Sequence, residues 1–233
     1  MNMKNILIIG GSSDIGISLA KYLTNKNYQV ITTYNNNRVD IPGIEVLKCD
    51  VTNEESICTV FKYIIDKYKH IDILINMAAI SIDSLVEDKT KDEFMKVVEV
   101  NLIGAFLTAK IYSKYVNNGL IINISSTDGI DTGSIYNIDY AASKAGLINI
   151  TKPLSMRFSN RVICICPNWI DSDSTNMMDN NYLTSELARI GQSRLITKDE
   201  FNECIYKTIN MKDENGSVFR IDIKGDKLWM EKI

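Results

Sequence analysis

The chain has very little histidine. Its 233 residues include one, His70, which follows Lys67, Tyr68 and Lys69 in a polar stretch. A single histidine excludes histidine-rich metal sites, and a Ser-His-Asp triad would depend entirely on this residue. We interpret His70 as a surface-loop residue, which disfavours a hydrolase.

Paired cysteines are also absent. The five cysteines are an odd number, and none belongs to a Cys-x-x-Cys pair. Cys164 and Cys166 alternate along an apparent strand, so their side chains point to one face at a spacing that zinc sites do not use. We expect reduced thiols in a cytoplasmic protein and no bound metal.

Long hydrophobic runs are missing as well. The N-terminal apolar run, Ile6–Ile9, is far shorter than the core of a signal peptide, and no run approaches the ~20 residues of a membrane helix. The net charge is −3, whereas a nucleic-acid binder normally has a basic patch or stripe. The composition therefore predicts no membrane partner and no nucleic-acid partner.

No internal repeat, low-complexity tract or Pro/Gly-rich linker divides the sequence. A length of 233 residues suits one large α/β domain, which we expect to span residues 1–233. The hydrophobic content of 45% allows a substantial core without disulfides or a structural metal.

Short apolar runs alternate with longer stretches of helical period along the chain. Runs that are apolar on both faces are typical of parallel strands buried beneath helices. Thr52–Glu55 and Thr90–Glu93 have the pattern of capping boxes, and each precedes a helical stretch. The alternation predicts a doubly wound parallel sheet with ligands at the carboxyl ends of its strands. The predicted strands are Asn5–Ile9, Gln29–Tyr34, Glu45–Lys48, Asp72–Ile75, Leu120–Ile124, Val162–Cys166 and Val218–Ile223.

The first predicted strand runs into GGSSDIG, from Gly10 to Gly16. Glycines allow a tight turn, and the helix that follows presents free N–H groups to a phosphate. Asp14 stands where a second phosphate-facing glycine is expected. We interpret it as the helix N-cap, which accepts from the N–H of Gly16 or Ile17 and faces away from the ligand.

Other predicted strands also end in polar residues. Asp50 follows the third strand, where it could accept from an adenine amino group or simply precede a helix. Asn76 ends the fourth strand and is followed by small residues that allow a ligand to approach. Asn101 falls on the buried face of its helix, where its amide either holds a neighbouring loop or belongs to a polar relay.

Tyr140 and Lys144 lie one helical turn apart in DYAASKAG, shortly after the fifth strand ends in INISS. A phenol has a pKa near 10, which makes it a poor acid–base catalyst at neutral pH. A lysine ammonium beside it favours the phenolate and lowers that pKa. The pair therefore indicates acid–base chemistry.

Taken together, these segments resemble the short-chain dehydrogenase/reductase family over essentially the whole chain, and 3-oxoacyl-[acyl-carrier-protein] reductases in particular. The matching segments occur in the family's order: GGSSDIG, CDV, NMAA, VNLIG, NISS, YAASK, PNWIDS, SRLITKDEF and NGSVFRIDIKGD. The resemblance implies one three-layer Rossmann-like domain of about seven parallel strands with helices on both faces. It also implies a homodimer or homotetramer.

The resemblance implies a catalytic tetrad of Asn101, Ser126, Tyr140 and Lys144. Ser126, rather than Ser125, matches the family's serine. Tyr140 would exchange the proton, Ser126 would hydrogen-bond the carbonyl oxygen, Lys144 would lower the phenol pKa and bind the nicotinamide ribose, and Asn101 would hold a relay water. The implied cofactor contacts are Gly10, Ser12, Ser13, Asp14, Ile15, Gly16, Asn35, Arg38, Asp50, Val51, Asn76, Ala78, Tyr140, Lys144, Pro167, Ile170 and Ser172.

The residues after the second strand bear on the choice of cofactor. An acid at this point binds the ribose 2′-hydroxyl of NAD. Here the stretch reads TTYNNNR, with no acid before Asp40 and with Arg38 within reach of a phosphate. We therefore predict NADPH rather than NADH.

The expected activity is NADPH-dependent reduction of a carbonyl to a secondary alcohol. The preferred candidate substrate is a 3-oxoacyl thioester of acyl carrier protein or coenzyme A. Two alternatives stay open: an alcohol or sugar dehydrogenase working oxidatively, and a silent dinucleotide sensor or assembly subunit. The chain also departs from the family pattern, because Asn168 replaces a glycine and Pro153 lies inside the predicted Tyr140 helix. The stretch Asp173–Thr197 lies where the family's substrate loops lie.

Overall fold

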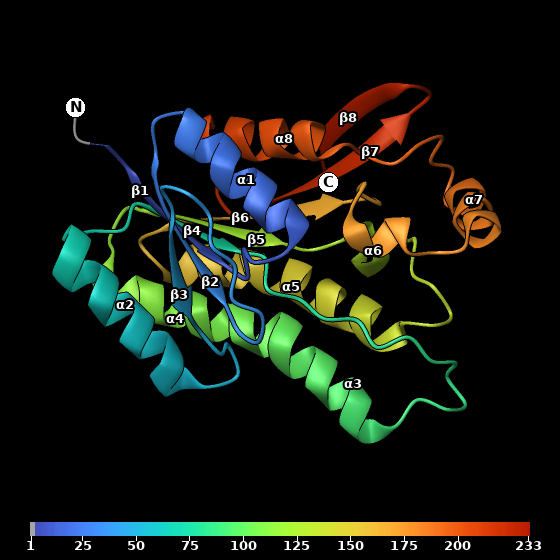
Figure 1. The fold of residues 1–233 in the computed structure, drawn as a ribbon, viewed down its shortest axis with the longest axis horizontal. Helices are drawn as coiled ribbons and strands as arrows, with labels where there is room; N and C mark the ends of the chain where they lie inside the picture. Colours follow the sequence, from blue (N-terminus) through green and yellow to red (C-terminus); the bar gives the residue numbers. More distant parts are fainter. Residues whose placement is uncertain (1–2) are drawn as a thin grey trace.

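The computed structural model describes residues 3–233 and arranges their strands in one eight-stranded sheet (Figure 1). The spatial order is β3-β2-β1-β4-β5-β6-β7-β8. Strands β1 to β7 pair in parallel, and β8 pairs antiparallel with β7. The strands are β1 (Asn5–Ile9), β2 (Gln29–Tyr34), β3 (Glu45–Lys48), β4 (Ile73–Asn76), β5 (Leu120–Ile124), β6 (Arg161–Pro167), β7 (Ser217–Lys224) and β8 (Lys227–Lys232).

Helices cover both faces of this sheet, which makes the fold the three-layer Rossmann-like arrangement that the sequence predicts (Figure 1). Helices α1 and α8 cover one face, and α2, α4 and α5 cover the other. The longer helices are α1 (Asp14–Asn25), α2 (Glu54–Tyr68), α3 (Lys91–Val98), α4 (Gly104–Tyr115), α5 (Ile138–Arg157), α7 (Asn180–Arg189) and α8 (Lys198–Asn210). Shorter ones are α6 (Asp173–Asn176), the π-helical turn Glu99–Ile103 and the 3₁₀ turn Thr127–Gly129.

The two cores follow from the alternation of side chains along the buried strands. In β1, Ile6 and Ile8 pack with the helices on one face, whereas Leu7 and Ile9 pack with those on the other. Every residue of β1, β4 and β5 is buried. An apolar run without polar alternation is what a strand covered on both faces requires.

The seven predicted strands are present with boundaries that differ by at most one residue. The eighth, β8, was not predicted, because its residues are half-buried or exposed and carry no continuous apolar run. It lies on the edge of the sheet and ends the parallel series. Helix α5 continues through Pro153 without a break.

Of the two predicted capping boxes, the one at Thr90 is confirmed by its reciprocal bonds with Glu93. The one at Thr52 is wrong, because Asn53 is the N-cap of α2 and accepts from Glu55 and Ser56 N–H. The helical stretch predicted after Thr90–Glu93 begins at Lys91 as α3 and passes through the π-helical turn before it continues as α4.

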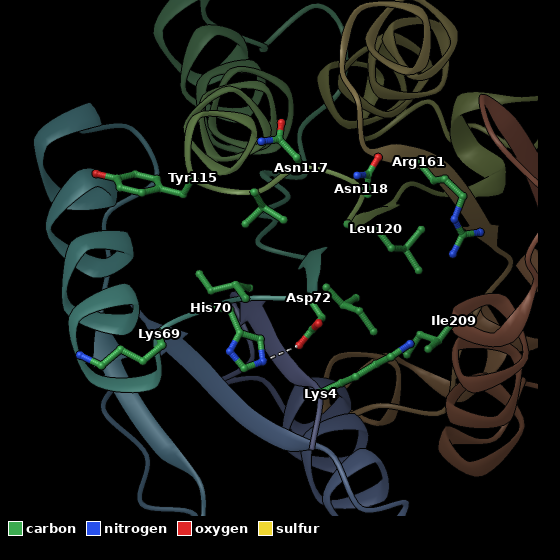
Figure 2. A pocket seen from close by; sticks show the side chains of 14 residues that line it. Lys4, Lys69, His70, Asp72, Tyr115, Asn117, Asn118, Leu120, Arg161 and Ile209 are labelled. Atoms are coloured by element: carbon green, nitrogen blue, oxygen red, sulfur yellow. Dashed lines mark ion pairs between the residues drawn. The ribbon is translucent and has the colours of Figure 1, made fainter. Parts of the chain in front are cut away.

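At the amino ends of the central strands, opposite the carboxyl ends where a ligand is expected, lies a cavity of about 310 Å³ (Figure 2). His70 and Asp72 lie in it, with His70 Nε2 3.3 Å from Asp72 Oδ2. His70 is exposed on a loop that precedes β4, which confirms its interpretation as a surface residue. It lies at the far end of the strands from Tyr140.

In residues 3–233, no helix is both long enough and apolar enough to cross a membrane.

Candidate active site

The glycine turn after β1 has the shape that close packing requires. Gly10 has a φ of 82°, and a Cβ at this position would lie 2.4 Å from Ala78 Cα. A Cβ on Gly16 would lie 2.5 Å from Gly11 Cα. Side chains are excluded at both points, so the first turn of α1 sits directly against the carboxyl end of β1. This arrangement presents helix N–H groups to an anion.

The predicted role of Asp14 in this turn is wrong. Ser13 is the N-cap of α1, and its Oγ accepts from the N–H of Gly16 at 3.1 Å. Asp14 is instead the first residue of the helix. Ser and Asp cap helices about equally well, so the sequence alone did not separate the two neighbours.

Asp14 reaches to the other half of the molecule. Its Oδ2 accepts from the backbone N–H of Asp173 at 3.0 Å and lies 2.7 Å from Lys198 Nζ. Burial acts to raise the pKa of Asp14. The hydrogen bonds from Lys198 and from the backbone N–H groups of Asp173 and Ile15 outweigh burial and hold that pKa below its usual value. Asp14 therefore stays ionised, and its charge is matched by a lysine.

A cavity of about 340 Å³ opens beside the glycine turn. Six of the predicted cofactor residues line it, namely Gly10, Ser12, Ser13, Asn35, Val51 and Ala78. Backbone, small side chains and neutral amides make up most of these walls. Their position at the carboxyl ends of β1 and β2 fits a dinucleotide, since this is where α/β sheets bind such ligands.

Eleven predicted cofactor residues do not line this cavity, and the side chains of three of them, Arg38, Asp50 and Asn76, have other contacts. Arg38 is on the surface, 68% exposed, with its Nε 3.5 Å from Asp40 Oδ1. The carboxylate of Asp50 accepts from the backbone N–H and the hydroxyl of Thr52 through Oδ1, which orders the turn before α2. The side chain of Asn76 is directed into the core, as described next.

Asn76 makes three hydrogen bonds within the fold. Its Nδ2 donates to Ala105 O and to Asn123 Oδ1, and its Oδ1 accepts from Thr108 Oγ1 at 2.7 Å. The amide is 3% exposed and its capacity is used in tying β4 to β5 and α4. The side chain is therefore structural, and contact with a ligand would come from the backbone.

The predicted catalytic side chains converge at the carboxyl end of β5. Lys144 Nζ lies 5.3 Å from the centre of the Tyr140 ring, as the one-turn spacing predicts. The hydroxyl of Ser126 lies near enough to the phenol of Tyr140 to act on its pKa, and it accepts from the N–H of Asp128 at 3.1 Å. Ser125 instead donates to Lys144 O, so Ser126 is the serine that faces the phenol.

The predicted lowering of the Tyr140 pKa is wrong in this structure. Burial raises the pKa of the phenol, the charge of Asp128 raises it further, and the hydrogen bond with Ser126 only partly offsets both. The ammonium of Lys144 donates to Ile124 O at 2.9 Å rather than to the phenol. Burial also lowers the pKa of Lys144 to about 8. Removal of both groups from water dominates, and sequence spacing carries no information on that.

Asn101 lies in the π-helical turn and is 1% exposed. Its Oδ1 accepts from Ile80 N at 2.8 Å, and its Nδ2 donates to Ile80 O and to Ser143 Oγ. The structure thus supports the first alternative, in which Asn101 holds a loop. Its role in a water relay stays a prediction. π-helical turns are frequent at functional sites, because they redirect a side chain out of the regular helix.

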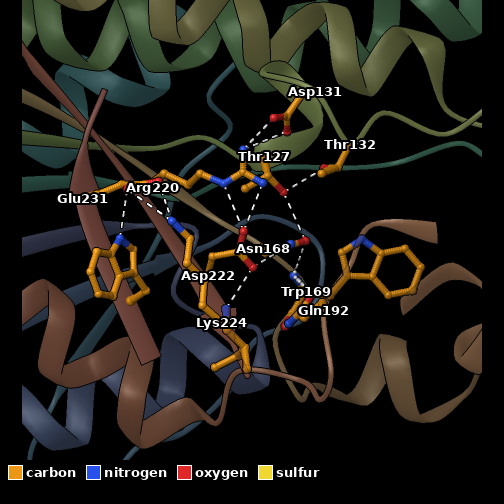
Figure 3. A network of polar contacts seen from close by, with 12 residues as sticks. Thr127, Asp131, Thr132, Asn168, Trp169, Gln192, Arg220, Asp222, Lys224 and Glu231 are labelled. Carbon is orange, nitrogen blue, oxygen red and sulfur yellow. Dashed lines mark hydrogen bonds and ion pairs between the residues drawn. The ribbon is translucent and has the colours of Figure 1, made fainter. Parts of the chain in front are cut away.

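Asn168, the residue that departs from the family pattern, lies at the centre of a buried polar network (Figure 3). Its Oδ1 accepts from Thr127 Oγ1 at 3.1 Å, and its Nδ2 donates to Asp222 Oδ1 at 3.1 Å. Arg220 then joins Asp222 to Asp131 through ion pairs. The network fastens the turn after Ser126 to β6 and β7. Sequence reasoning missed it, because the partners are 41 and 54 residues away.

The remaining predicted contacts follow Pro167 at the end of β6. Ile170 is buried and bridges to Ile196, while Ser172 caps α6 by accepting from Thr175 N–H. The stretch Asp173–Thr197 forms α6 and α7, and the ring of Tyr182 packs edge-on against Tyr136. That this stretch borders the substrate stays a prediction.

Similar proteins are known. A sequence model of the family described as short chain dehydrogenase matches residues 4–183. Carbonyl reductase family member 4 of Xenopus laevis is 33% identical over 199 residues, covering 79% of this chain and 84% of that protein. The 3-oxoacyl-[acyl-carrier-protein] reductase FabG of Vibrio cholerae is 31% identical over 205 residues, covering 82% and 84%. The crystal structure of a short chain dehydrogenase from Bacillus anthracis superposes with a TM-score of 0.79 at 27% identity, covering 94% and 95%.

Proposed function

Because the chain belongs to the short chain dehydrogenase family and is an NAD(P)-dependent oxidoreductase, we propose that it uses NADPH to reduce a carbonyl to a secondary alcohol. The observation that carries the proposal is the meeting of Tyr140, Ser126 and Lys144 at one strand end, beside a cavity that fits a dinucleotide. NADPH, when bound, supplies a hydride to the carbonyl carbon.

The side chains divide the remaining work. Tyr140 gives its proton to the carbonyl oxygen, and Ser126 donates a hydrogen bond to the same oxygen as negative charge grows on it. Lys144 binds the nicotinamide ribose and supplies positive charge near the phenol. Tyr140 is protonated at neutral pH, as a proton donor must be, although its raised pKa makes the phenol a weaker acid.

The pKa shift does not separate reduction from oxidation. Oxidation of an alcohol needs the phenolate as a base, and reduction leaves the same phenolate behind, so the burial and the charge of Asp128 that disfavour it act on both directions. An oxidative alcohol or sugar dehydrogenase is the second candidate. A silent sensor is the third, since a protein that only binds a dinucleotide has no use for Tyr140 beside Ser126.

The preference for NADPH is supported by the end of β2. Asn35, Asn36 and Asn37 line the cavity there, and none of them carries the negative charge that would repel a 2′-phosphate. Arg38 follows directly, with an exposed guanidinium that a phosphate can attract. Amide donors and a nearby cation favour binding of the 2′-phosphate of NADPH over binding of the free 2′-hydroxyl of NADH.

The proposed substrate is a 3-oxoacyl thioester of acyl carrier protein or coenzyme A. Support comes from the relative at 31% identity, whose name gives that activity. The relative at 33% identity is named only as a carbonyl reductase. A broader range of ketones therefore belongs in the assay.

A panel assay tests the proposal. Acetoacetyl-coenzyme A, simple ketones, aldehydes and sugar-derived ketones are offered with NADPH and, separately, with NADH, and the loss of absorbance of the reduced coenzyme is followed. We expect turnover with NADPH on at least one carbonyl and none in the Tyr140→Phe variant. Turnover only of alcohols with the oxidised coenzyme would favour the second candidate, and coenzyme binding with no turnover would favour the third.

Association into a homodimer or homotetramer in the cytoplasm stays a prediction. Exposed apolar side chains include Ile103 in the π-helical turn, Phe106 in α4 and Met156 in α5. Light scattering of the purified protein measures the number of subunits directly.

A further inference from the structure

A buried ion pair lies immediately beside Tyr140. Lys89 Nζ is 3.0 Å from Asp139 Oδ2, and the two side chains are 3% and 0% exposed. Most ion pairs of the described chain are more exposed, such as Lys67 with Glu45 and Lys110 with Glu54. Lys and Asp are rarely buried this completely unless they are paired. The pair belongs neither to the catalytic residues nor to the cofactor cavity.

Asp139 holds the backbone of Tyr140 through its other oxygen. Its Oδ1 accepts from the N–H of Tyr140 at 2.9 Å. The N-cap residue of α5, Asn137, makes no capping hydrogen bond with its side chain. The first N–H groups of a helix have no intrahelical partner, so Asp139 satisfies one of them from inside the helix. Its negative charge also suits the first turn of a helix.

Lys89 holds Asp139 from the loop that joins β4 to α3. The ammonium donates to Ile82 O in the same loop and faces Asp139 across the gap to α5. The N–H of Ser84 donates to Tyr136 O at 2.8 Å, which fastens the loop a second time just before α5. Lys89 is thus the fixed end of a short chain of contacts that leads to the main chain of Tyr140.

From this geometry, and on the premise of the proposed reductase, we propose that Lys89 and Asp139 form a positioning pair. The pair fixes the first turn of α5 against the β4–α3 loop and so sets where the phenol of Tyr140 meets the carbonyl oxygen. Neither residue touches the reacting atoms. Proton transfer depends steeply on such placement, since a displacement of about 1 Å can lower a rate about 100-fold.

Removing one partner also leaves the other as an unpaired buried charge, which the site can relieve only by rearranging. Lys89→Met keeps the length and apolar stem of lysine but strands the carboxylate of Asp139. Asp139→Asn keeps an oxygen that can accept from the Tyr140 N–H but strands the ammonium. The double variant Lys89→Met/Asp139→Asn removes both charges and keeps the acceptor, so it is expected to recover part of what each single variant loses.

The first measurement is amide hydrogen exchange in the first turn of α5, residues 138–141, which needs no substrate. We expect exchange in this turn to accelerate at least tenfold in Lys89→Met, with partial recovery in the double variant. Leu23→Ala, a cavity variant in α1 on the other face of the sheet, serves as the control for lost stability. If the turn exchanges no faster in Lys89→Met than in Leu23→Ala, the pair does not position α5.

The second measurement uses the best carbonyl substrate of the panel. We expect kcat to fall 30- to 100-fold in Lys89→Met while the Kd of NADPH changes less than threefold, because the cofactor cavity does not include either residue. Should Lys89→Met fail to fold, the nearly isosteric Asp139→Asn gives the same comparison with an expected loss of about tenfold. Parallel losses of kcat and of NADPH affinity would overturn the positioning role.

The two measurements separate this inference from the proposed function. Faster exchange in the first turn, with no carbonyl reduced by the unmodified protein, would support the pair and reject the reductase. Unchanged exchange, together with normal reductase activity in both single variants, would reject the positioning pair and support the reductase.

Discussion

Around β1 and β2, the carboxyl edge of the sheet is lined by main chain and small or neutral side chains, whereas around β5 and β6 it is lined by buried polar ones. In the first region Gly10 and Ala78 leave a cavity of about 340 Å³. In the second, Lys144 and Asn168 are 2% and 3% exposed, and each is hydrogen-bonded to another element.

The difference teaches how each region recognises its ligand. A wall of backbone binds through shape and N–H groups, so most single side-chain changes alter affinity little. Buried side chains that hold one another are arranged before the substrate arrives, so a change in one of them disturbs several. Substitutions in the two regions are therefore expected to differ in size and in kind.

The largest effect is expected in the second region, from Tyr140→Phe. This change removes the hydroxyl that transfers the proton and leaves the ring in place. General acid catalysis contributes about 10²–10⁴-fold, so kcat is expected to fall by that factor. NADPH titrated by fluorescence should bind with a Kd within twofold of the original. Activity that survives within a few-fold, with the cofactor bound, would contradict the proposed role of Tyr140.

The next effect is expected from Asn168→Gly, which restores the glycine of the family pattern. Asn168 bridges Thr127 and Asp222, and its loss leaves buried polar groups without a partner. We expect the free energy of unfolding to fall by about 1–3 kcal/mol, since that is the penalty for an unpaired buried group. Urea denaturation measures it.

Asn36→Gly is the matched control, because Asn36 lies in the exposed wall of the cavity in the first region. Its free energy of unfolding is expected to stay within about 1 kcal/mol, the usual range for an exposed position. Equal losses in the two variants would remove the contrast between the regions.

A feature of these regions can be predicted from the sequence when it depends on residues that are close together along the chain. The strands were predictable because continuous apolar runs mark buried strands, and Tyr140 and Lys144 were predictable because one helical turn places them side by side. The half-exposed strand β8 carries no such run. The bonds of Asn168 join residues far apart along the chain, so no local pattern reveals them.

The sign of the Tyr140 pKa shift was unpredictable for a related reason. Sequence spacing gives the neighbour, Lys144, but burial and the nearby Asp128 decide the sign. The prediction of the N-cap of α1 was wrong although it needs only local information, because Ser13 and Asp14 are adjacent and both residue types are good caps. Recognition of Asp14 as a partner of Lys198 requires the packing of α1 against α8.

A change in the choice of coenzyme is the effect expected in the first region. Asn35→Asp places a carboxylate at the end of β2, where it repels a 2′-phosphate and accepts from a 2′-hydroxyl. We expect the ratio of kcat/KM for NADPH to that for NADH to fall about tenfold or more, which corresponds to about 1.4 kcal/mol. Stability should be unchanged. A preference of the unmodified protein for NADH would contradict the premise.

The smallest effect is expected where the two regions meet, from Asp14→Asn. Asp14 belongs to the glycine turn, yet its carboxylate holds the start of α6 and pairs with Lys198. The amide can still accept from Asp173 but carries no charge. At pH 7 we expect the free energy of unfolding to fall by about 1 kcal/mol, the size of one such bond, while NADPH binds as tightly or slightly more tightly because a negative charge near its phosphates is gone.

The pH dependence of that difference identifies its source. The pKa of Asp14 is lowered in the folded state, so its charge contributes stability above the unfolded pKa of 3.8, and this contribution is lost as the pH falls through the lower folded value. The unfolding free energies of the original chain and of Asp14→Asn should therefore converge at acid pH. Lys198→Met should remove most of the difference at pH 7. A large loss of NADPH affinity in Asp14→Asn would instead give the carboxylate a direct role in binding, and the glycine turn would then recognise its ligand by a side chain after all.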